Sequence, residues 1–122
     1  MPYTDEVRNK KLLEVIREGI LVLRSVEFEM KNDYKSNKKT FLKNIHFDDV
    51  VIINNVSILI LDMLHNLPEI IQKRNYIDAY NELVLVNGLE NALFQLKGNF
   101  RFEGSIKRYV NFVNEVIQSS FP

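Results

Sequence analysis

Two residues near the end of a long apolar segment have a spacing that could bind a metal ion. Asp62 and His65 are three residues apart, and on a helix this spacing directs both side chains toward one point, as in the half-motif of di-iron bundles. Such centres need a second pair and further carboxylates, whereas the chain has two His and His46 is not paired in that way. We therefore expect a solvent-facing polar pair, and no metal or other cofactor.

The residue types of other enzyme sites are present without the arrangement that catalysis needs. Ser57, Asp62 and His65 are the residues of a hydrolase triad, but they follow one another along one segment without a Gly-x-Ser-x-Gly turn. Asp78 and Glu82 stand one helical turn apart, where like charges are usually just solvated. Neither a phosphate-binding loop, a dinucleotide fingerprint nor a zinc spacing occurs. The sequence predicts a protein that is not an enzyme.

A basic segment offers a different chemistry. Residues 31–43 contain one Asp and five lysines, which are Lys31, Lys35, Lys38, Lys39 and Lys43. With Tyr34 and Phe41 interleaved, they could contact phosphates and stack on a base. Lysine-rich connections are commonly only solubilising, and this one has no Arg to bind a phosphate or guanine in a bidentate manner. A nucleic-acid-binding accessory protein is therefore the alternative hypothesis.

Length and composition limit the class of protein. With 122 residues, 46% hydrophobic and 26% charged, the chain is expected to form one domain over residues 1–122. The absence of Cys excludes disulfides and thiolate chemistry. The net charge of zero is a cancellation, because the basic segment is offset by residues 44–66, which hold three Asp and neither Lys nor Arg.

Targeting signals and codon usage suggest where the protein works. The first residues carry Asp5 and Glu6 where a signal peptide has basic residues. The longest apolar stretch, Val50 to Leu64, is interrupted by polar residues and is shorter than the ~20 residues that span a bilayer. We expect a cytoplasmic protein without membrane contact. The abundance of Asn, Ile, Lys, Phe and Tyr reflects AT-rich codons and suggests a low-GC bacterium or one of its phages or mobile elements.

Apolar periodicity predicts a long first helix from about Asp5 to Met30, with Thr4 as its N-cap. Its core stripe is expected to consist of Leu12, Val15, Ile16, Ile20, Leu23, Val26 and Met30. Gly19 lies near this stripe and indicates a close contact with another helix. The basic segment then forms a polar connection.

The apolar stretch at Val50 fits either a strand pair or a helix. Two β-branched runs around Asn54-Asn55 could be strands. However, the polar residues of this region share one arc of a helical wheel; they are Asp48, Asn54, Asn55, Asp62, His65 and Asn66. We therefore predict a largely buried helix from about Asp49 to Asn66.

The remaining chain is predicted to be helical with breaks. Asn66 ends the second helix, and Pro68 begins a short one that runs to Arg74. Apolar residues change phase at Tyr76 and again beyond Asn87-Gly88, so the chain bends at both places; a β-hairpin near 83–96 is the alternative. After a loop at 98–104, Ser105 is expected to cap an amphipathic final helix. The predicted architecture is a single bundle of four to five helices.

Four apolar residues lie on the polar faces of the first two helices. Leu21 and Phe28 are seven apart beside Arg17 and Arg24, and Val51 and Ile58 are seven apart near Asn55. A spacing of seven places each pair along one line of its helix, which suits packing against another helix. For Val51 and Ile58 the simpler explanation is a covering helix of the same chain, whereas for Leu21 and Phe28 an intermolecular contact is equally well supported.

These observations favour a non-enzymatic protein–protein interaction module. It would bind another protein, or itself as a homodimer, through the first helix and through the face of the second helix on which polar and apolar residues mix. Binding, inhibitor, immunity and chaperone-type proteins are often small helical bundles, but this comparison rests on size and fold class alone. The expected interface residues are Arg17, Leu21, Arg24, Phe28, Val51, Asn55 and Ile58.

Overall fold

The described part of the chain is helical apart from short connections. The computed structural model describes residues 3–36 and 47–120, and no strand occurs in them. They form α1 (Asp5–Ser36), α3 (Phe47–Gln72), α4 (Tyr76–Val84), α5 (Asn87–Leu93) and α6 (Phe102–Ser120). The predicted all-α class is confirmed. The hairpin alternative near 83–96 is wrong, since this segment contains the end of α4 and all of α5.

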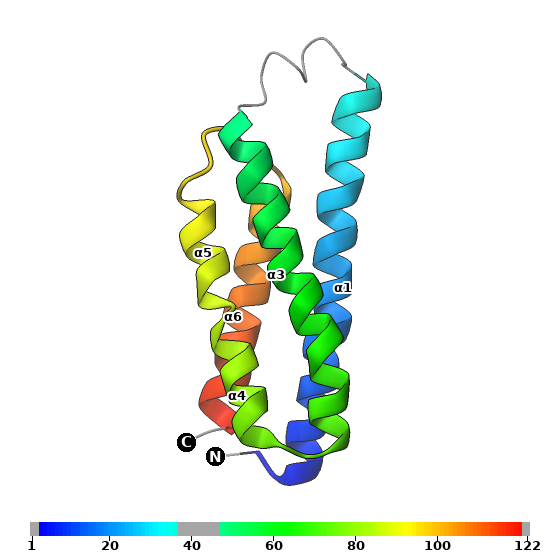
Figure 1. Cartoon of the computed structure of the whole chain (residues 1–122), viewed down its shortest axis with the longest axis vertical. Coiled ribbons are helices and arrows are strands. Elements are labelled where there is room, and N and C mark those ends of the chain that lie inside the picture. Colours follow the sequence, from blue (N-terminus) through cyan, green and yellow to red (C-terminus); the bar gives the residue numbers. More distant parts are fainter. Residues whose placement is uncertain (1–2, 37–46, 121–122) are drawn as a thin grey trace.

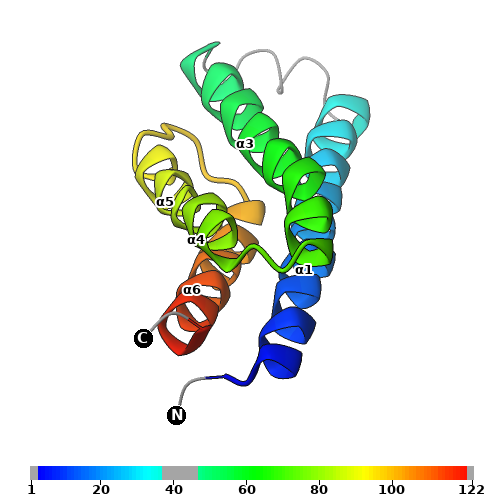
Figure 2. The ribbon, with the colours of Figure 1, turned by 60° about the horizontal axis from the view of Figure 1, so that its bottom comes forward.

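The helices form an antiparallel bundle with α4 and α5 in line as one broken column (Figure 1). α1 packs against α3 and α6, while α4 and α5 pack against both α3 and α6. Figure 2 shows the resulting cyclic order, with α1 and the α4–α5 column on opposite sides. The residues before α1 and the end of α6 meet at one end of the bundle, where the Tyr3 N–H donates to the Ser119 carbonyl at 2.8 Å.

The core is formed by the apolar stripes of the helices in the described residues. Its fully buried side chains include Leu12, Val15, Ile60, Met63, Leu67, Leu83, Leu89, Ile106 and Val113. The stripe of α1 is rotated from the predicted one: Val22 is buried, whereas Ile20 is 38% exposed. The reason is that α1 packs against helices on two sides, so that its buried face is set by α6 as well as by α3.

α3 is longer than predicted and passes through Pro68 without ending. The predicted separate helix from Pro68 to Arg74 is therefore wrong. A proline inside a helix removes one backbone hydrogen bond. Here the residues on both sides of it still face the core, with Leu67 buried and Ile70 and Ile71 partly buried against the cluster. Burial of these side chains offsets the lost bond and keeps the segment helical.

The actual end of α3 uses a left-handed residue. Arg74 has φ = 54°, and the next N–H, of Asn75, donates to the Ile70 carbonyl at 3.1 Å. This is the pattern of a Schellman-type helix end, which usually has Gly at the left-handed position. Asn75 then caps α4 by accepting from the Asp78 N–H at 3.3 Å.

α6 begins at Phe102, three residues before the predicted cap at Ser105. That prediction was wrong because the capping group comes from another helix. Glu29 of α1 accepts from the N–H groups of Arg101 at 2.6 Å and Phe102 at 2.9 Å. A carboxylate at a helix N-terminus satisfies unpaired N–H groups and complements the helix dipole. Ser105 lies inside the helix and accepts from Arg108 at 3.3 Å.

Within the described residues, α3 is long and apolar enough to cross a membrane by length and composition alone, over Asp48–Gln72. The expectation that this region is too short to span a bilayer was based on the apolar stretch from Val50 to Leu64, and the longer α3 removes the argument from length. A core helix passes the same test, and α3 contributes Ile53, Val56, Ile60, Met63 and Leu67 to the core.

Candidate functional site

A groove runs along the surface between α1 and α6. Its lower part is a hollow of about 400 Å³, and its upper part is a hollow of about 540 Å³. Both are lined by Ser25 of α1 and Ser105 of α6. The other lining residues of the lower hollow are Glu14, Glu18, Leu21, Val22, Arg108, Tyr109 and Phe112, and those of the upper hollow are Phe28, Glu29, Asn99, Arg101 and Phe102. The two hollows therefore form one continuous groove.

The floor of the groove is a close contact between α1 and α6. The Tyr109 hydroxyl donates to the Val15 carbonyl at 3.0 Å. A Cβ atom at Gly19 would lie 2.9 Å from that hydroxyl oxygen and 3.1 Å from Leu64 Cδ2, which explains why a glycine stands there. Burial, and next the charge of Glu18, raise the pKa of the Tyr109 phenol above its usual range. The hydroxyl thus stays protonated to a higher pH than an exposed phenol would, and it donates to the Val15 carbonyl.

Leu21 and Phe28 form the apolar rim of the groove on α1. Their side chains are 46% and 67% exposed, and each lines one of the two hollows. The spacing of seven residues brings them along one line, as the sequence predicted. Arg17 and Arg24 are exposed but do not line the groove. Arg17 instead lies 3.8 Å from Glu18 and lines a shallow hollow with Lys10, Leu13 and Glu14.

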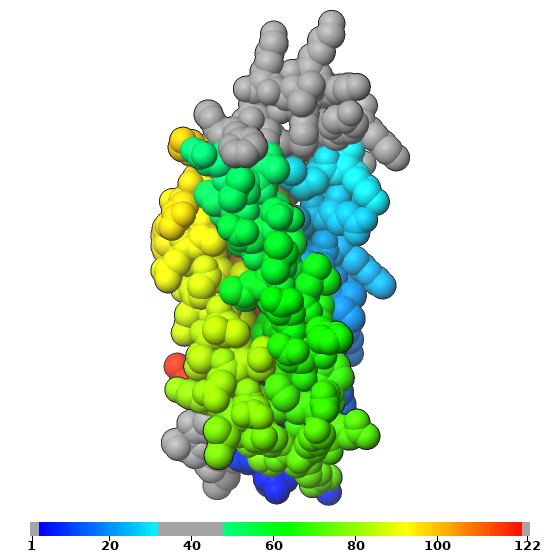
Figure 3. Space-filling model, viewed as in Figure 1, coloured from blue at the N-terminus to red at the C-terminus, as the bar shows by residue number. Residues whose placement is uncertain are grey.

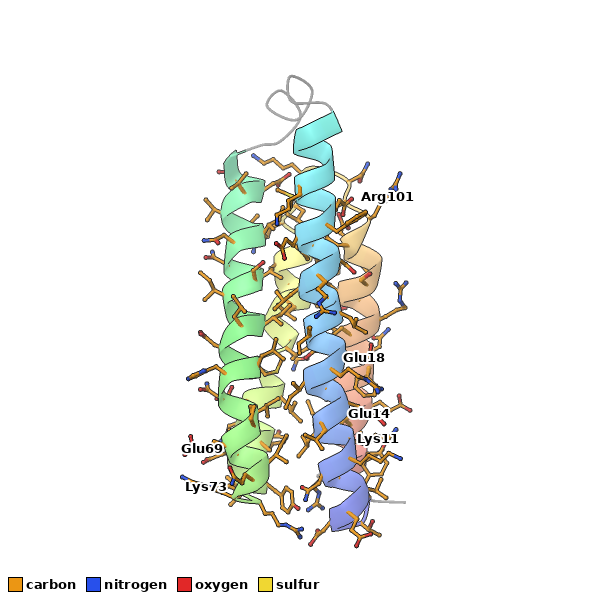
Figure 4. All side chains as sticks on the ribbon, turned by 90° about the vertical axis from the view of Figure 1, so that its right-hand side faces the viewer. Lys11, Glu14, Glu18, Glu69, Lys73 and Arg101 are labelled. Atoms are coloured by element: carbon orange, nitrogen blue, oxygen red, sulfur yellow. The ribbon has the colours of Figure 1, made fainter. Side chains whose placement is uncertain are left out.

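Charged residues line both hollows of the groove. Figure 4 shows Arg101 near one end and Glu18 and Glu14 toward the other. Arg101 is exposed, and Glu14 pairs with Lys11 at 3.3 Å. The third groove acid, Glu29, is engaged by the backbone at the start of α6. The groove is therefore apolar at its α1 rim, with Glu14, Glu18 and Arg108 in the lower hollow and Glu29 and Arg101 in the upper one.

Val51, Asn55 and Ile58 lie on α3, outside this groove, and all three are exposed. Val51 and Ile58 are 43% and 46% exposed. The expectation that a helix of the same chain covers them is therefore wrong. The physical reason is that α3 packs against α1 on one flank and the α4–α5 column on the other, which leaves its outer face open.

The residues considered for catalysis or metal binding are not gathered into one centre. Asp62 and His65 are exposed, and the described residues contain no group of three or more His, Cys, Asp or Glu that could hold a metal ion. Asp78 accepts from Asn75 at 2.7 Å. Glu82 accepts from Asn66 at 3.3 Å, which ties α4 to α3.

Of the five lysines considered for nucleic-acid binding, the structure describes the side chain of Lys31. Its Nζ lies 2.7 Å from Glu27 Oε1, and this hydrogen bond lowers the pKa of the Glu27 carboxyl. The side chains of Lys35, Lys38, Lys39 and Lys43 lie outside the described residues. Nucleic-acid binding therefore stays a prediction.

Sequence reasoning missed the α6 side of the groove and two anchoring carboxylates. Ser105, Arg108 and Tyr109 were assigned to a helix, but periodicity does not say which helix stands opposite. The carboxylates of Glu29 and Asp49 accept backbone hydrogen bonds from segments far along the chain. The burial of Asp49 could have been predicted from the sequence, because Asp49 stands on the apolar side of the helical wheel of α3.

Comparisons of this chain with protein-family models, with curated proteins and with solved structures found no match.

Proposed function

We propose that this protein is a small helical protein-binding module whose α1/α6 groove binds an amphipathic helix of a partner protein. The proposal is carried by one observation. Two large apolar side chains, Leu21 and Phe28, are exposed in line along a continuous groove flanked by charge. A helix that places one apolar face into a hydrophobic groove is a recurring mode of recognition.

The dimensions and charges of the groove define the partner helix. From Glu14 to Phe28 the rim covers 14 residue steps of α1, which corresponds to about 21 Å at 1.5 Å per residue, or four turns of a docked helix. The partner should carry apolar residues about seven apart that pack beside Leu21 and Phe28. A basic residue should face Glu14 and Glu18, and an acidic residue should face Arg101. Aromatic and Arg side chains in this surface are the types enriched at binding hot spots.

The function belongs to the class of binding, inhibitor, immunity or chaperone-type proteins, without a reaction of its own. The observation in favour of this class is the nature of the groove: its charged groups include no cluster of catalytic geometry, and one of its acids, Glu29, is engaged by the backbone at the start of α6.

A displayed library of helical peptides tests the proposal without knowledge of the natural partner. Peptides selected on the native protein should carry two apolar anchors seven apart, a basic residue toward one end and an acidic residue toward the other. Leu21→Asp with Phe28→Asp should keep the fold, because both side chains are exposed, and should weaken the selected peptides at least about tenfold, equivalent to ~1.4 kcal/mol. Leu13→Asp is the matched control, since Leu13 is 56% exposed on α1 but lies outside the groove.

Two outcomes contradict the proposal. In the first, the selected peptides bind the double variant as tightly as the native protein. In the second, the library yields no peptide whose binding depends on the groove. If the double variant unfolds, Glu18→Lys provides the second measurement: Glu18 has a side chain 41% exposed, so its reversal should leave the fold intact and lower the affinity of peptides with a basic end.

A further inference from the structure

The outer face of α3 is a second apolar surface, separate from the groove. Four of its apolar side chains are exposed, namely Val50 (41%), Val51 (43%), Ile58 (46%) and Leu61 (53%). Asn54 and Asn55 are exposed between them. Figure 3 shows α3 running along the middle of one face of the molecule, between α1 and the α4–α5 column. Large exposed apolar side chains gathered on one helix face indicate an interaction surface.

This face lacks charge along its whole central part. From Val50 to Leu61 the chain contains no Asp, Glu, Lys or Arg, and 28% of the most apolar part of α3 is buried inside the bundle. Solvent-exposed helix faces normally carry charged residues. Depletion of charge is typical of the centre of a protein–protein interface.

The exposed residues are spaced symmetrically. Val51 and Ile58 stand at equal distances before and after the midpoint between Asn54 and Asn55. If two copies of α3 cross antiparallel at this midpoint, Val51 of one copy meets the partner's Ile58, Ile58 meets the partner's Val51, and the asparagines face each other. Val50 and Leu61 extend the contact at its two ends. Val50 of one copy lies within about one helical turn of the partner's Leu61. A twofold interface requires this kind of self-complementarity.

The charges beside this face also fit a second copy. Asp48 lies at one end of the face, where Lys97 Nζ pairs with it at 3.0 Å, and Asp62 lies at the other end. A twofold axis in the interface brings the same flank of both copies together, so Lys97 of one copy approaches the partner's Asp62. The ammonium group then lies between two carboxylates, and opposite charges meet at both ends of the contact.

We infer that the protein forms a homodimer in which the outer faces of two α3 helices pair antiparallel about the Asn54–Asn55 midpoint. Opposed asparagines inside an apolar helix contact fix its register, as a buried Asn does in coiled coils. A lipid surface suits this face less well, since Asn54, Asn55 and Ser57 would find no hydrogen-bond partners there. The dimer uses a surface other than the groove and does not depend on the proposed function.

The mass in solution tests this inference on the full chain. Sedimentation equilibrium from about 10 µM to about 1 mM should show a shift from the monomer of 14.4 kDa to twice that mass, because this range covers the weak end of specific association. Val51→Glu and Ile58→Lys, made separately, should each weaken the dimer at least about tenfold, since each introduces two unpaired charges against apolar side chains. Phe94→Glu is the matched control, because Phe94 is 78% exposed and lies at the C-terminal end of α5 rather than on α3.

Mixing the two variants tests the antiparallel register. In a mixed dimer, the carboxylate introduced by Val51→Glu in one chain faces the ammonium group introduced by Ile58→Lys in the other chain. The second contact, between Ile58 of the first chain and Val51 of the other, is intact. The mixture should therefore dimerise more strongly than either variant alone. A native protein that stays monomeric up to about 1 mM overturns the inference, and so does a mixture that stays monomeric. Circular dichroism checks that both variants are folded. If the native protein binds neutral phospholipid vesicles and does not dimerise, the outer face of α3 is a membrane-binding surface instead.

Discussion

Asp49 and Gly98 are 49 residues apart in the chain, and the Gly98 N–H donates to Asp49 Oδ2 at 2.9 Å. The neighbouring Lys97 N–H donates to Asp49 Oδ1 at 2.8 Å. Asp49 is completely buried, and both of its carboxylate oxygens are thus engaged by successive backbone groups. This contact fastens the segment after α5 to the start of α3, and so determines where the chain turns toward α6 and the groove.

Replacement of Asp49 by Ala should destabilise the protein by about 3 kcal/mol, because the partly buried N–H groups of Lys97 and Gly98 lose a charged acceptor. Asp49→Asn keeps one acceptor oxygen and should cost less than Asp49→Ala. The free energy of unfolding from urea denaturation provides the measurement. Asp48→Ala is the neighbouring control: its side chain is 66% exposed in an ion pair with Lys97, so the expected change is within about 0.5 kcal/mol. If Asp49→Ala and Asp48→Ala lower the free energy of unfolding equally, Asp49 does not fasten the segment after α5 to α3.

The cap that Glu29 supplies to α6 should also be measurable. Glu29→Ala removes the acceptor of the Arg101 and Phe102 N–H groups and should cost about 1–2 kcal/mol, as other N-cap losses do. Because α6 forms one wall of the groove, the variant should also weaken groove-dependent peptides. Glu27→Ala is the control on the same helix, since Glu27 is exposed and pairs with exposed Lys31 one turn away. A loss for Glu29→Ala no greater than for Glu27→Ala would show that α6 starts without this cap.

Local sequence signals predicted most of the helices, but they failed where a contact with a distant part of the chain determines the boundary of a helix. The amphipathic final helix was predicted correctly, since α6 buries Ile106, Tyr109, Val110, Val113 and Val116 on one face. The helical periodicity of α3 also outweighed its β-branched composition, as predicted. The predicted start of α6 at Ser105 failed because the cap comes from Glu29, 73 residues before Phe102.

The candidate site was predicted only on its α1 side. The positions of Leu21 and Phe28 follow from periodicity, because the wheel of a single helix shows which residues face away from the core. The opposite wall depends on which helix packs beside α1, and periodicity does not contain that information. Pro68 illustrates the same limit, since its local signal for a helix start was overcome by the packing of Leu67 and Ile71 on either side of it.

The contact between Gly19 and Tyr109 should make Gly19→Ala destabilising. Alanine is favoured over glycine in a helix by about 1 kcal/mol, but the new Cβ would lie 2.9 Å from the Tyr109 hydroxyl oxygen. Overpacking of this kind costs about 1–3 kcal/mol, so we expect a net loss of about 1 kcal/mol. Gly104→Ala is the control, since a Cβ there meets only the end of Arg108 at 3.5 Å. In a Tyr109→Phe background, Gly19→Ala should cost less, and a double-mutant cycle measures this coupling; additive effects would exclude the clash.

The raised pKa of Tyr109 predicts how the stability of the bundle changes at alkaline pH. Since burial favours the neutral phenol in the folded state, the unfolded chain loses this proton first, at about pH 10. The stabilisation is complete below that pH and is lost as the pH rises above it toward the folded pKa. Tyr109→Phe should cost about 1 kcal/mol at about pH 7, where it removes the hydrogen bond to Val15. At about pH 11 the native protein carries the cost of keeping the phenol neutral and the variant does not. Urea denaturation at both pH values should therefore show a smaller difference between the two proteins at the higher pH, and a difference that stays constant or grows would contradict the burial of this phenol.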